Sequence, residues 1–99
     1  MYGTVARLTI KPGKEAEFMA QGQNEDDLKV PGHIGELIYR MDADPNTYFM
    51  AVIFDSKESY IANAESAGQN ERYEEMVALL DGPPEWHDGE IIHSHPKLG

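Results

Sequence analysis

Residues 48–54, with the sequence YFMAVIF, constrain the fold more than any other segment of the chain. The run contains no charged or amide side chain, and an apolar run without polar alternation is typical of a strand covered on both faces. It leads directly into Asp55-Ser56-Lys57-Glu58-Ser59-Tyr60, where Ser56 is a suitable N-cap for a helix. The sequence therefore predicts a central strand, followed by a helix, that needs a cover on each of its two faces.

The length of 99 residues predicts a single domain spanning residues 1–99. A chain this short buries only about two thirds of its surface when it folds alone, so a second copy could supply the missing cover. No apolar run approaches the roughly 20 residues of a membrane-spanning helix. The N-terminus shows no basic segment followed by an apolar one. We therefore expect a cytoplasmic protein that does not insert into a membrane.

Charge and cysteine content exclude several classes of function. The net charge of −10, with scattered Lys and Arg residues, argues against nucleic-acid binding because it repels a polyphosphate. The chain has no cysteine, which excludes disulfides, thiolate nucleophiles and thiolate-bound zinc from this chain alone. Neither a Gly-rich phosphate loop nor a Ser-His-Asp pattern stands out. Any chemistry has to come from other groups.

The periodicity of apolar residues predicts strands alternating with helical regions. Strands are expected over residues 2–10, 34–41, 47–55 and 86–95, and helices over residues 13–28 and 56–80, with a break at Ala67-Gly68. In the first strand, Ala6, Leu8 and Ile10 share one face because of the two-residue period. The order β-α-β-β-α-β predicts an α+β, ferredoxin-like fold with an antiparallel sheet and both helical regions on one face.

Short motifs recur at the ends of these elements. They are Ile10-Lys11-Pro12-Gly13-Lys14-Glu15, Pro31-Gly32-His33, Asp44-Pro45 and Phe54-Asp55-Ser56-Lys57-Glu58-Ser59-Tyr60. In this order they resemble the antibiotic biosynthesis monooxygenase family of the dimeric α/β-barrel superfamily, over nearly the whole chain. The resemblance implies a homodimer in which two sheets meet face to face to form a barrel. Such a dimer would provide the second cover that residues 48–54 require.

The resemblance also implies a cavity for a small aromatic or apolar molecule between the sheet and the helices of each subunit. In that arrangement Met50, Val52 and Phe54 line the cavity, and Tyr60 overhangs it and orients the substrate. The quinone-forming members need no metal, flavin or other cofactor, because the deprotonated phenolic substrate itself donates an electron to oxygen. The resemblance therefore implies a monooxygenase without a cofactor.

Two positions depart from the pattern of those enzymes. They have Trp at the position of Phe54 and Asn at that of Met50, and the side chains present here cannot replace those hydrogen bonds. The departures leave two alternatives open on the same scaffold: a noncatalytic binding or stress-response protein, and an isomerase or lyase. The haem-degrading branch has Trp and His where this chain has Asn63 and Tyr73, so haem is not expected.

Other side chains are candidates because of their position. His33 follows a Pro-Gly turn at the mouth of a strand, where an imidazole can act as a general base on a phenol or enol. The alternative for His33 is a histidine that caps the strand at the surface. Tyr39 and Trp86 can stack on a flat aromatic ligand, or can serve as core or interface packing.

His93 and His95 would share one side of the last strand if its pleat were regular, about 7 Å apart at Cα. A metal site needs at least a third ligand, which the sequence does not provide, so an exposed C-terminal tail is favoured over a metal site. A buried Arg7 would need a carboxylate partner such as Glu36 or Glu90, and a structural ion pair is favoured over anion binding.

Overall fold

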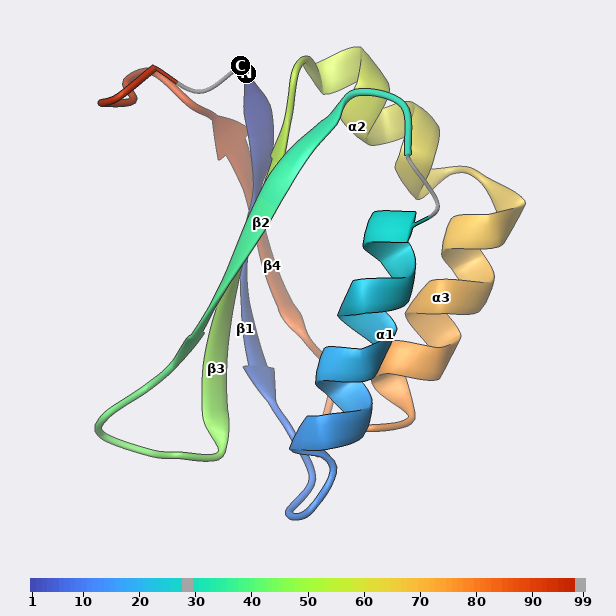
Figure 1. Ribbon diagram of the computed structural model, residues 1–99, viewed down its shortest axis with the longest axis vertical. Coiled ribbons are helices and arrows are strands. Elements are labelled where there is room, and N and C mark those ends of the chain that lie inside the picture. The colour runs from blue at the N-terminus through green and yellow to red at the C-terminus, as the bar shows by residue number, and fades with distance from the viewer. Residues whose placement is uncertain (28–29, 98–99) are drawn as a thin grey trace.

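The computed structural model describes residues 1–27 and 30–97, and it confirms the predicted α+β, ferredoxin-like fold. The strands are β1 (Tyr2–Thr9), β2 (His33–Arg40), β3 (Thr47–Phe54) and β4 (Glu85–Glu90). The helices are α1 (Glu15–Asp27), α2 (Lys57–Ala64) and α3 (Ala67–Val77). The strands form one sheet in the order β2-β3-β1-β4 with antiparallel neighbours, and the helices lie together on one side of it (Figure 1).

The sheet has a covered face, which packs against the helices, and an open face on the other side. On β1, Ala6 and Leu8 point to the covered face and are buried, whereas Val5 and Arg7 point away and are exposed. The predicted division of this strand into two faces is therefore confirmed. Arg7 forms an ion pair with Glu85 at 3.6 Å on the open face, instead of with Glu36 or Glu90.

Strand β3 lies inside the sheet, between β2 and β1, which explains its uninterrupted apolar sequence. Tyr48, Met50 and Phe54 are buried on the covered face. The residues that alternate with them on the open face, Phe49 and Ile53 among them, are only half-buried. The expectation of a central strand is confirmed, and the chain's own helices cover only one of its two faces.

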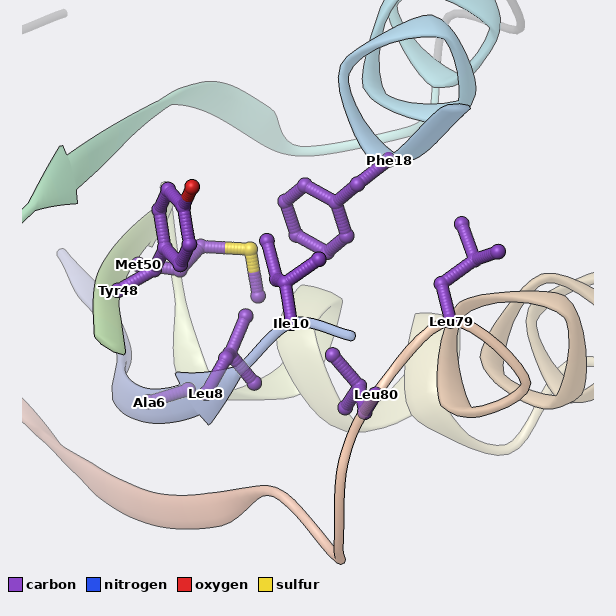
Figure 2. Packing of buried hydrophobic residues seen from close by; sticks show 8 residues of the cluster. All are labelled: Ala6, Leu8, Ile10, Phe18, Tyr48, Met50, Leu79 and Leu80. Atoms are coloured by element: carbon purple, nitrogen blue, oxygen red, sulfur yellow. The ribbon is translucent and has the colours of Figure 1, made fainter. Parts of the chain in front are cut away.

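The core fills the end of the molecule where β1 leads into α1. Phe18 reaches from α1 toward Ile10, with Leu79 and Leu80 beside them (Figure 2). Backbone hydrogen bonds hold this end together, from Lys11 N to the Leu79 carbonyl at 2.9 Å and from Asp81 N to the carbonyl of Thr9 at 2.7 Å. The segment after α3 is thereby fixed to the end of β1.

The second helical region divides at Glu65-Ser66, two residues before the predicted break at Ala67-Gly68. Ser66 caps α3, because its Oγ accepts a hydrogen bond from Gln69 N at 3.2 Å and donates one to the Asn63 carbonyl at 2.8 Å. A serine cap thus sets the break, and Gly68 lies inside the first turn of α3. The predicted end of the first helix, at Leu28, lies outside the described residues.

The last strand ends at Glu90, which corrects the prediction that it continues to residue 95. Glu90 pairs with Tyr2, and Ile91 N donates to the Met1 carbonyl at 3.0 Å, which is the last contact between the two strands. His93 and His95 therefore lie after the strand, and no pleat aligns them. Over residues 1–27 and 30–97, no helix combines the length and apolar character that crossing a bilayer requires.

Candidate functional site

A cavity of about 520 Å³ lies between the sheet and the helices, which is in the size range of small-molecule sites. The covered face of the sheet forms its floor, and residues of α1, α2 and α3 contribute to its other walls. Six of the side chains that the sequence singles out line it: His33, Met50, Val52, Phe54, Tyr60 and Trp86. Most of the floor is formed by apolar side chains, and a smaller number of polar side chains also line the cavity.

Tyr39, the remaining candidate for ligand stacking, does not line the cavity. It pairs with Phe49 across β2 and β3, and both residues belong to the open face of the sheet. Its side chain is 53% exposed there. The reason is the two-residue period of a strand, which places Tyr39 on the side opposite to Ile38. Of the two aromatic residues predicted to stack on a ligand, Trp86 lines the cavity and Tyr39 does not.

An irregularity at the start of β2 turns His33 toward the cavity. His33 pairs with Phe54 and Gly35 with Ile53, so Ile34 is an extra residue on β2 and the strand contains a bulge. In a regular strand without the bulge, His33 would share a face with Gly35 and point away from the helices. The bulge places it on the same side as Glu36 and Ile38.

The turn before His33 is fixed against the start of α2. Gly32 has a φ of +81°, and a Cβ at this position would lie 2.4 Å from Ser59 Cβ. Both observations require glycine here. The Gly32 carbonyl accepts a hydrogen bond from Asp55 N at 2.8 Å. The position of His33 therefore depends on a close contact between the Pro-Gly turn and the residues that open α2.

His33 and Tyr60 flank the ring of Phe54. The centroid of the Phe54 ring lies 5.4 Å from that of His33 and 5.6 Å from that of Tyr60, and both contacts are edge to face. Phe54 itself is only 2% exposed. An apolar ring thus separates two polar groups that both face the cavity, which suits a flat ligand with polar substituents at its edges.

Tyr60 reaches from α2 across the sheet to β4. Its hydroxyl donates a hydrogen bond to Asp88 Oδ1 at 2.8 Å. Burial, followed by this hydrogen bond and the charge of Asp88, raises the pKa of Tyr60 to about 12. The phenol is therefore neutral at physiological pH. It can donate and accept hydrogen bonds, but it does not supply a phenolate that could take up a proton.

Thr4 lies beside this pair, on the central part of β1. It is directly opposite Asp88 in the register of β1 and β4, and its residue is 5% exposed. Thr4 lies close enough to Tyr60 to work against the rise in the pKa of that phenol. However, no hydrogen bond of acceptable geometry reaches Thr4 Oγ1 within the described residues. A buried hydroxyl without a partner costs about 1–3 kcal/mol, so this part of the wall contains an unsatisfied polar group.

The opposite wall of the cavity has a polar cluster at the junction of α2 and α3. Arg72 donates to Gln69 Oε1 from Nε at 3.2 Å and from Nη2 at 3.0 Å, and to Asn63 Oδ1 at 3.4 Å. Tyr73 packs on Trp86 with ring centroids 6.2 Å apart. These contacts connect α3 to both α2 and β4 around the cavity.

Neither Thr4 nor Asp88 was predicted as a site residue from the sequence. The signal for Thr4 is that it is polar within the otherwise apolar series Ala6, Leu8 and Ile10. For Asp88 it is the two-residue spacing from Trp86, which places both on one face of β4. Within the described parts of the chain, no three His, Asp or Glu side chains lie close enough together to hold a metal ion.

Comparison with known proteins gives a consistent result. Residues 1–79 match the family model described as antibiotic biosynthesis monooxygenase. No curated protein matches the chain in sequence. The fold is similar to that of a variant of SnoaB, a cofactor-independent oxygenase from Streptomyces nogalater, with a TM-score of 0.80 and 16% identity over 97% of each chain.

Two further solved structures are similar in fold. A conserved protein from Methanosarcina mazei Go1 has a TM-score of 0.76 and 24% identity over 89% of each chain. A proposed antibiotic biosynthesis monooxygenase from Bordetella bronchiseptica has a TM-score of 0.77 and 21% identity, over 93% of this chain and 97% of that chain. These likenesses establish a shared fold. Because the family model also matches most of the sequence, including Phe54 and Tyr60, the chain belongs to the antibiotic biosynthesis monooxygenase family.

Proposed function

We propose that this protein oxygenates a small phenolic molecule in the cavity without a cofactor. The observation that carries the proposal is the arrangement of His33 and Tyr60 on either side of Phe54. A phenol lying over the apolar floor would meet a proton acceptor on one side and a neutral hydroxyl on the other. Family membership and the fold shared with a cofactor-independent oxygenase support the same reaction class.

In the proposed reaction His33 accepts the proton of the phenol, and Tyr60 orients the ring. The phenolate transfers one electron to oxygen, and the resulting radical pair combines to a peroxide at the carbon para to the hydroxyl. Loss of water then gives the quinone. One oxygen atom enters the product and the other leaves in water, so the substrate supplies all the electrons. The imidazole is suited to the first step because a neutral imidazole has one ring nitrogen that can accept a proton.

Oxygen uptake with 1-naphthol and a panel of dihydroxynaphthalenes tests this proposal, together with absorbance detection of the quinone. We expect His33→Ala and Tyr60→Phe each to lower the turnover rate by about 10²-fold, the lower end of the usual contribution of an acid-base group. His93→Ala, in the tail after β4, and Tyr39→Phe, on the open face, are matched controls and should retain the rate. Full turnover in both cavity variants would contradict the assigned roles.

A second candidate, a protein that binds such a molecule without converting it, is favoured by the chemistry of the floor. Met50 and Phe54 are buried there, at 8% and 2% exposure, and neither can donate a hydrogen bond to polarise a substrate oxygen. Saturable binding of the same phenols with no oxygen uptake and no product would support this candidate. Conversion of the ligand without oxygen uptake would instead indicate an isomerase or lyase.

We also propose that two copies associate through the open faces of their sheets. Val5, Leu37 and Tyr39 are 47%, 54% and 53% exposed on that face, and an apolar surface of this kind is often an interface. The half-buried side chains of β3 lie among them. Sedimentation at micromolar concentration should therefore give twice the chain mass of 11.1 kDa. A single species of the chain mass would contradict the dimer.

A further inference from the structure

We propose that Asp88, held by Tyr60 and accompanied by Thr4, makes the cavity selective for ligands that present a neutral hydroxyl group and against ligands that present a carboxylate. The inference rests on the proposed function, because the ligand is the same small aromatic molecule. It adds which polar group the ligand carries and which residues recognise that group.

The geometry provides an acceptor for a ligand hydroxyl. Asp88 lines the cavity, and its Oδ1 accepts the hydrogen bond from Tyr60 at 2.8 Å. This is the single hydrogen bond that the described residues make to the side chain of Asp88, so Oδ2 is available to a ligand. Packing positions the Tyr60 hydroxyl that bonds to Asp88, because the centroid of the Tyr60 ring lies 5.3 Å from that of Tyr2 and 5.6 Å from that of Phe54.

The same region provides a donor. Thr4 Oγ1 is buried, unpaired and on the residue directly opposite Asp88. A threonine hydroxyl can donate one hydrogen bond and accept another. A ligand hydroxyl, which also both donates and accepts, would donate a hydrogen bond to Asp88 and accept one from Thr4, while a second hydroxyl at the opposite edge of the ring, as in the dihydroxynaphthalenes, would face His33. An ammonium group cannot accept a hydrogen bond, and would leave the Thr4 proton without a partner.

The charges around the cavity disfavour a carboxylate ligand. Asp88 has no Lys, Arg or His partner within 4.0 Å among the described residues, so its negative charge is not neutralised by a neighbour. Glu36 and Glu65 add two more acidic side chains to the lining. The guanidinium of Arg72 lies on the helical wall, where it hydrogen-bonds to Asn63 and Gln69. A carboxylate beside Asp88 would thus face a like charge and two oxygens that only accept hydrogen bonds.

Titration calorimetry with three ligands of the same ring system tests the proposal. At about pH 7, 1-naphthol is neutral, 1-naphthoate is an anion and 1-naphthylmethylamine is a cation. We expect the wild-type protein to bind 1-naphthol at least tenfold more tightly than 1-naphthoate, because the carboxylate of 1-naphthoate would lie beside the like charge of Asp88. Tighter binding of 1-naphthylmethylamine than of 1-naphthol would overturn the proposal in favour of a cation site.

Variants then assign the selectivity to its residues. Asp88→Asn replaces one carboxylate oxygen by a donor, so the preference for 1-naphthol over 1-naphthoate should fall by about tenfold. Glu85→Gln is the matched control, because it removes one negative charge from the same strand but from the open face, and should leave the preference unchanged. Thr4→Val should weaken binding of 1-naphthol by about fivefold, which corresponds to the loss of one neutral hydrogen bond, and should not affect 1-naphthoate.

Equal affinity of the wild-type protein for 1-naphthol and 1-naphthoate would overturn the proposal, as would an unchanged preference in a folded Asp88→Asn protein or the absence of binding by either compound. Oxygen uptake measured on the same samples separates this inference from the proposed function. Selective binding without oxygen uptake supports the selectivity and contradicts the oxygenase. Oxygen uptake with an unaltered preference in Asp88→Asn overturns the selectivity and leaves the oxygenase in place. The comparison of ligands on the wild-type protein does not depend on whether a variant folds.

Discussion

The covered and open faces of the sheet both carry large apolar side chains, yet this chain buries only those of the covered face. Leu8, Tyr48 and Phe54 on the covered face are 1%, 3% and 2% exposed. Leu37 and Tyr39 on the open face are more than half exposed. The difference shows that an apolar strand sequence does not by itself indicate burial within one chain, because the helices cover only one of the two faces. The stability of the single chain therefore depends on the covered face.

A pair of leucine truncations measures this difference directly. Leu8→Ala should lower the free energy of unfolding by about 2–5 kcal/mol, because it leaves a cavity in a packed core. Leu37→Ala should lower it by less than about 1 kcal/mol in dilute solution, since its side chain is already half in water. Denaturant titrations at several protein concentrations check both values. Equal losses from the two substitutions, at all concentrations, would contradict the division into two faces.

A charge on the open face should weaken the proposed association of two copies. Leu37→Glu should raise the dissociation constant of the proposed dimer by at least tenfold, or about 1.4 kcal/mol, because it places a charge in an apolar contact. Sedimentation velocity over a dilution series gives this constant. Glu58→Gln, a change at the exposed start of α2, serves as a control and should not alter it. A dimer that is insensitive to Leu37→Glu would have to form through another surface.

Two buried threonines allow a finer comparison within the sheet. Thr47, at 6% exposure, donates a hydrogen bond to Asp44 Oδ2 at 3.0 Å, whereas Thr4, at 5% exposure, lacks a partner. Thr4→Val should therefore raise the free energy of unfolding by about 1 kcal/mol, and Thr47→Val should lower it by a similar amount. Thermal and denaturant unfolding of the two variants measure both. Loss of stability in Thr4→Val would mean that its hydroxyl is already paired.

The smallest expected effect is a change of stability at high pH. Folding raises the pKa of Tyr60 above its ordinary value of 10.0 to about 12, so the folded state holds this proton more tightly than the unfolded state. The contribution of this proton to the free energy of unfolding is complete below about pH 10 and is lost as the pH rises toward 12. Unfolding at about pH 9 and about pH 11 should show a larger decrease in the wild-type protein than in Tyr60→Phe. Tyr39→Phe, which retains the contact between Tyr60 and Asp88, should follow the wild-type protein.

Much of the fold could be predicted from the period of the apolar residues. The alternation of Ala6, Leu8 and Ile10 is enough to assign the faces of β1, and the unbroken apolar run of β3 is enough to place it inside the sheet. The extent of β4 could not be predicted in this way, because Ile91 and Ile92 continue an apolar pattern after the pairing residues of β1 have ended. Strand length depends on the partner as well as on the strand.

The candidate site was less accessible to sequence reasoning. Met50, Val52 and Phe54 follow from the strand period once the helices are placed, and the structure puts all three on the cavity wall. The face of the sheet on which Tyr39 lies depends on the register between β2 and β3, which a single sequence does not provide. Asp88 could not be predicted as a site residue, because its place in the site depends on a hydrogen bond from Tyr60, which is distant in sequence.

The bulge at Ile34 suggests how easily this cavity could gain or lose a reactive group during evolution. Regular pairing of β2 with β3 through Ile34 would place Ile34 opposite Phe54 and turn the imidazole of His33 out toward the open face, while the rest of β2 kept its pairing with β3. The presence or absence of a bulge at a strand end can therefore exchange the chemistry of the pocket without rebuilding its scaffold. Related proteins of this architecture could diverge in activity through such a bulge as readily as through substitutions in the pocket.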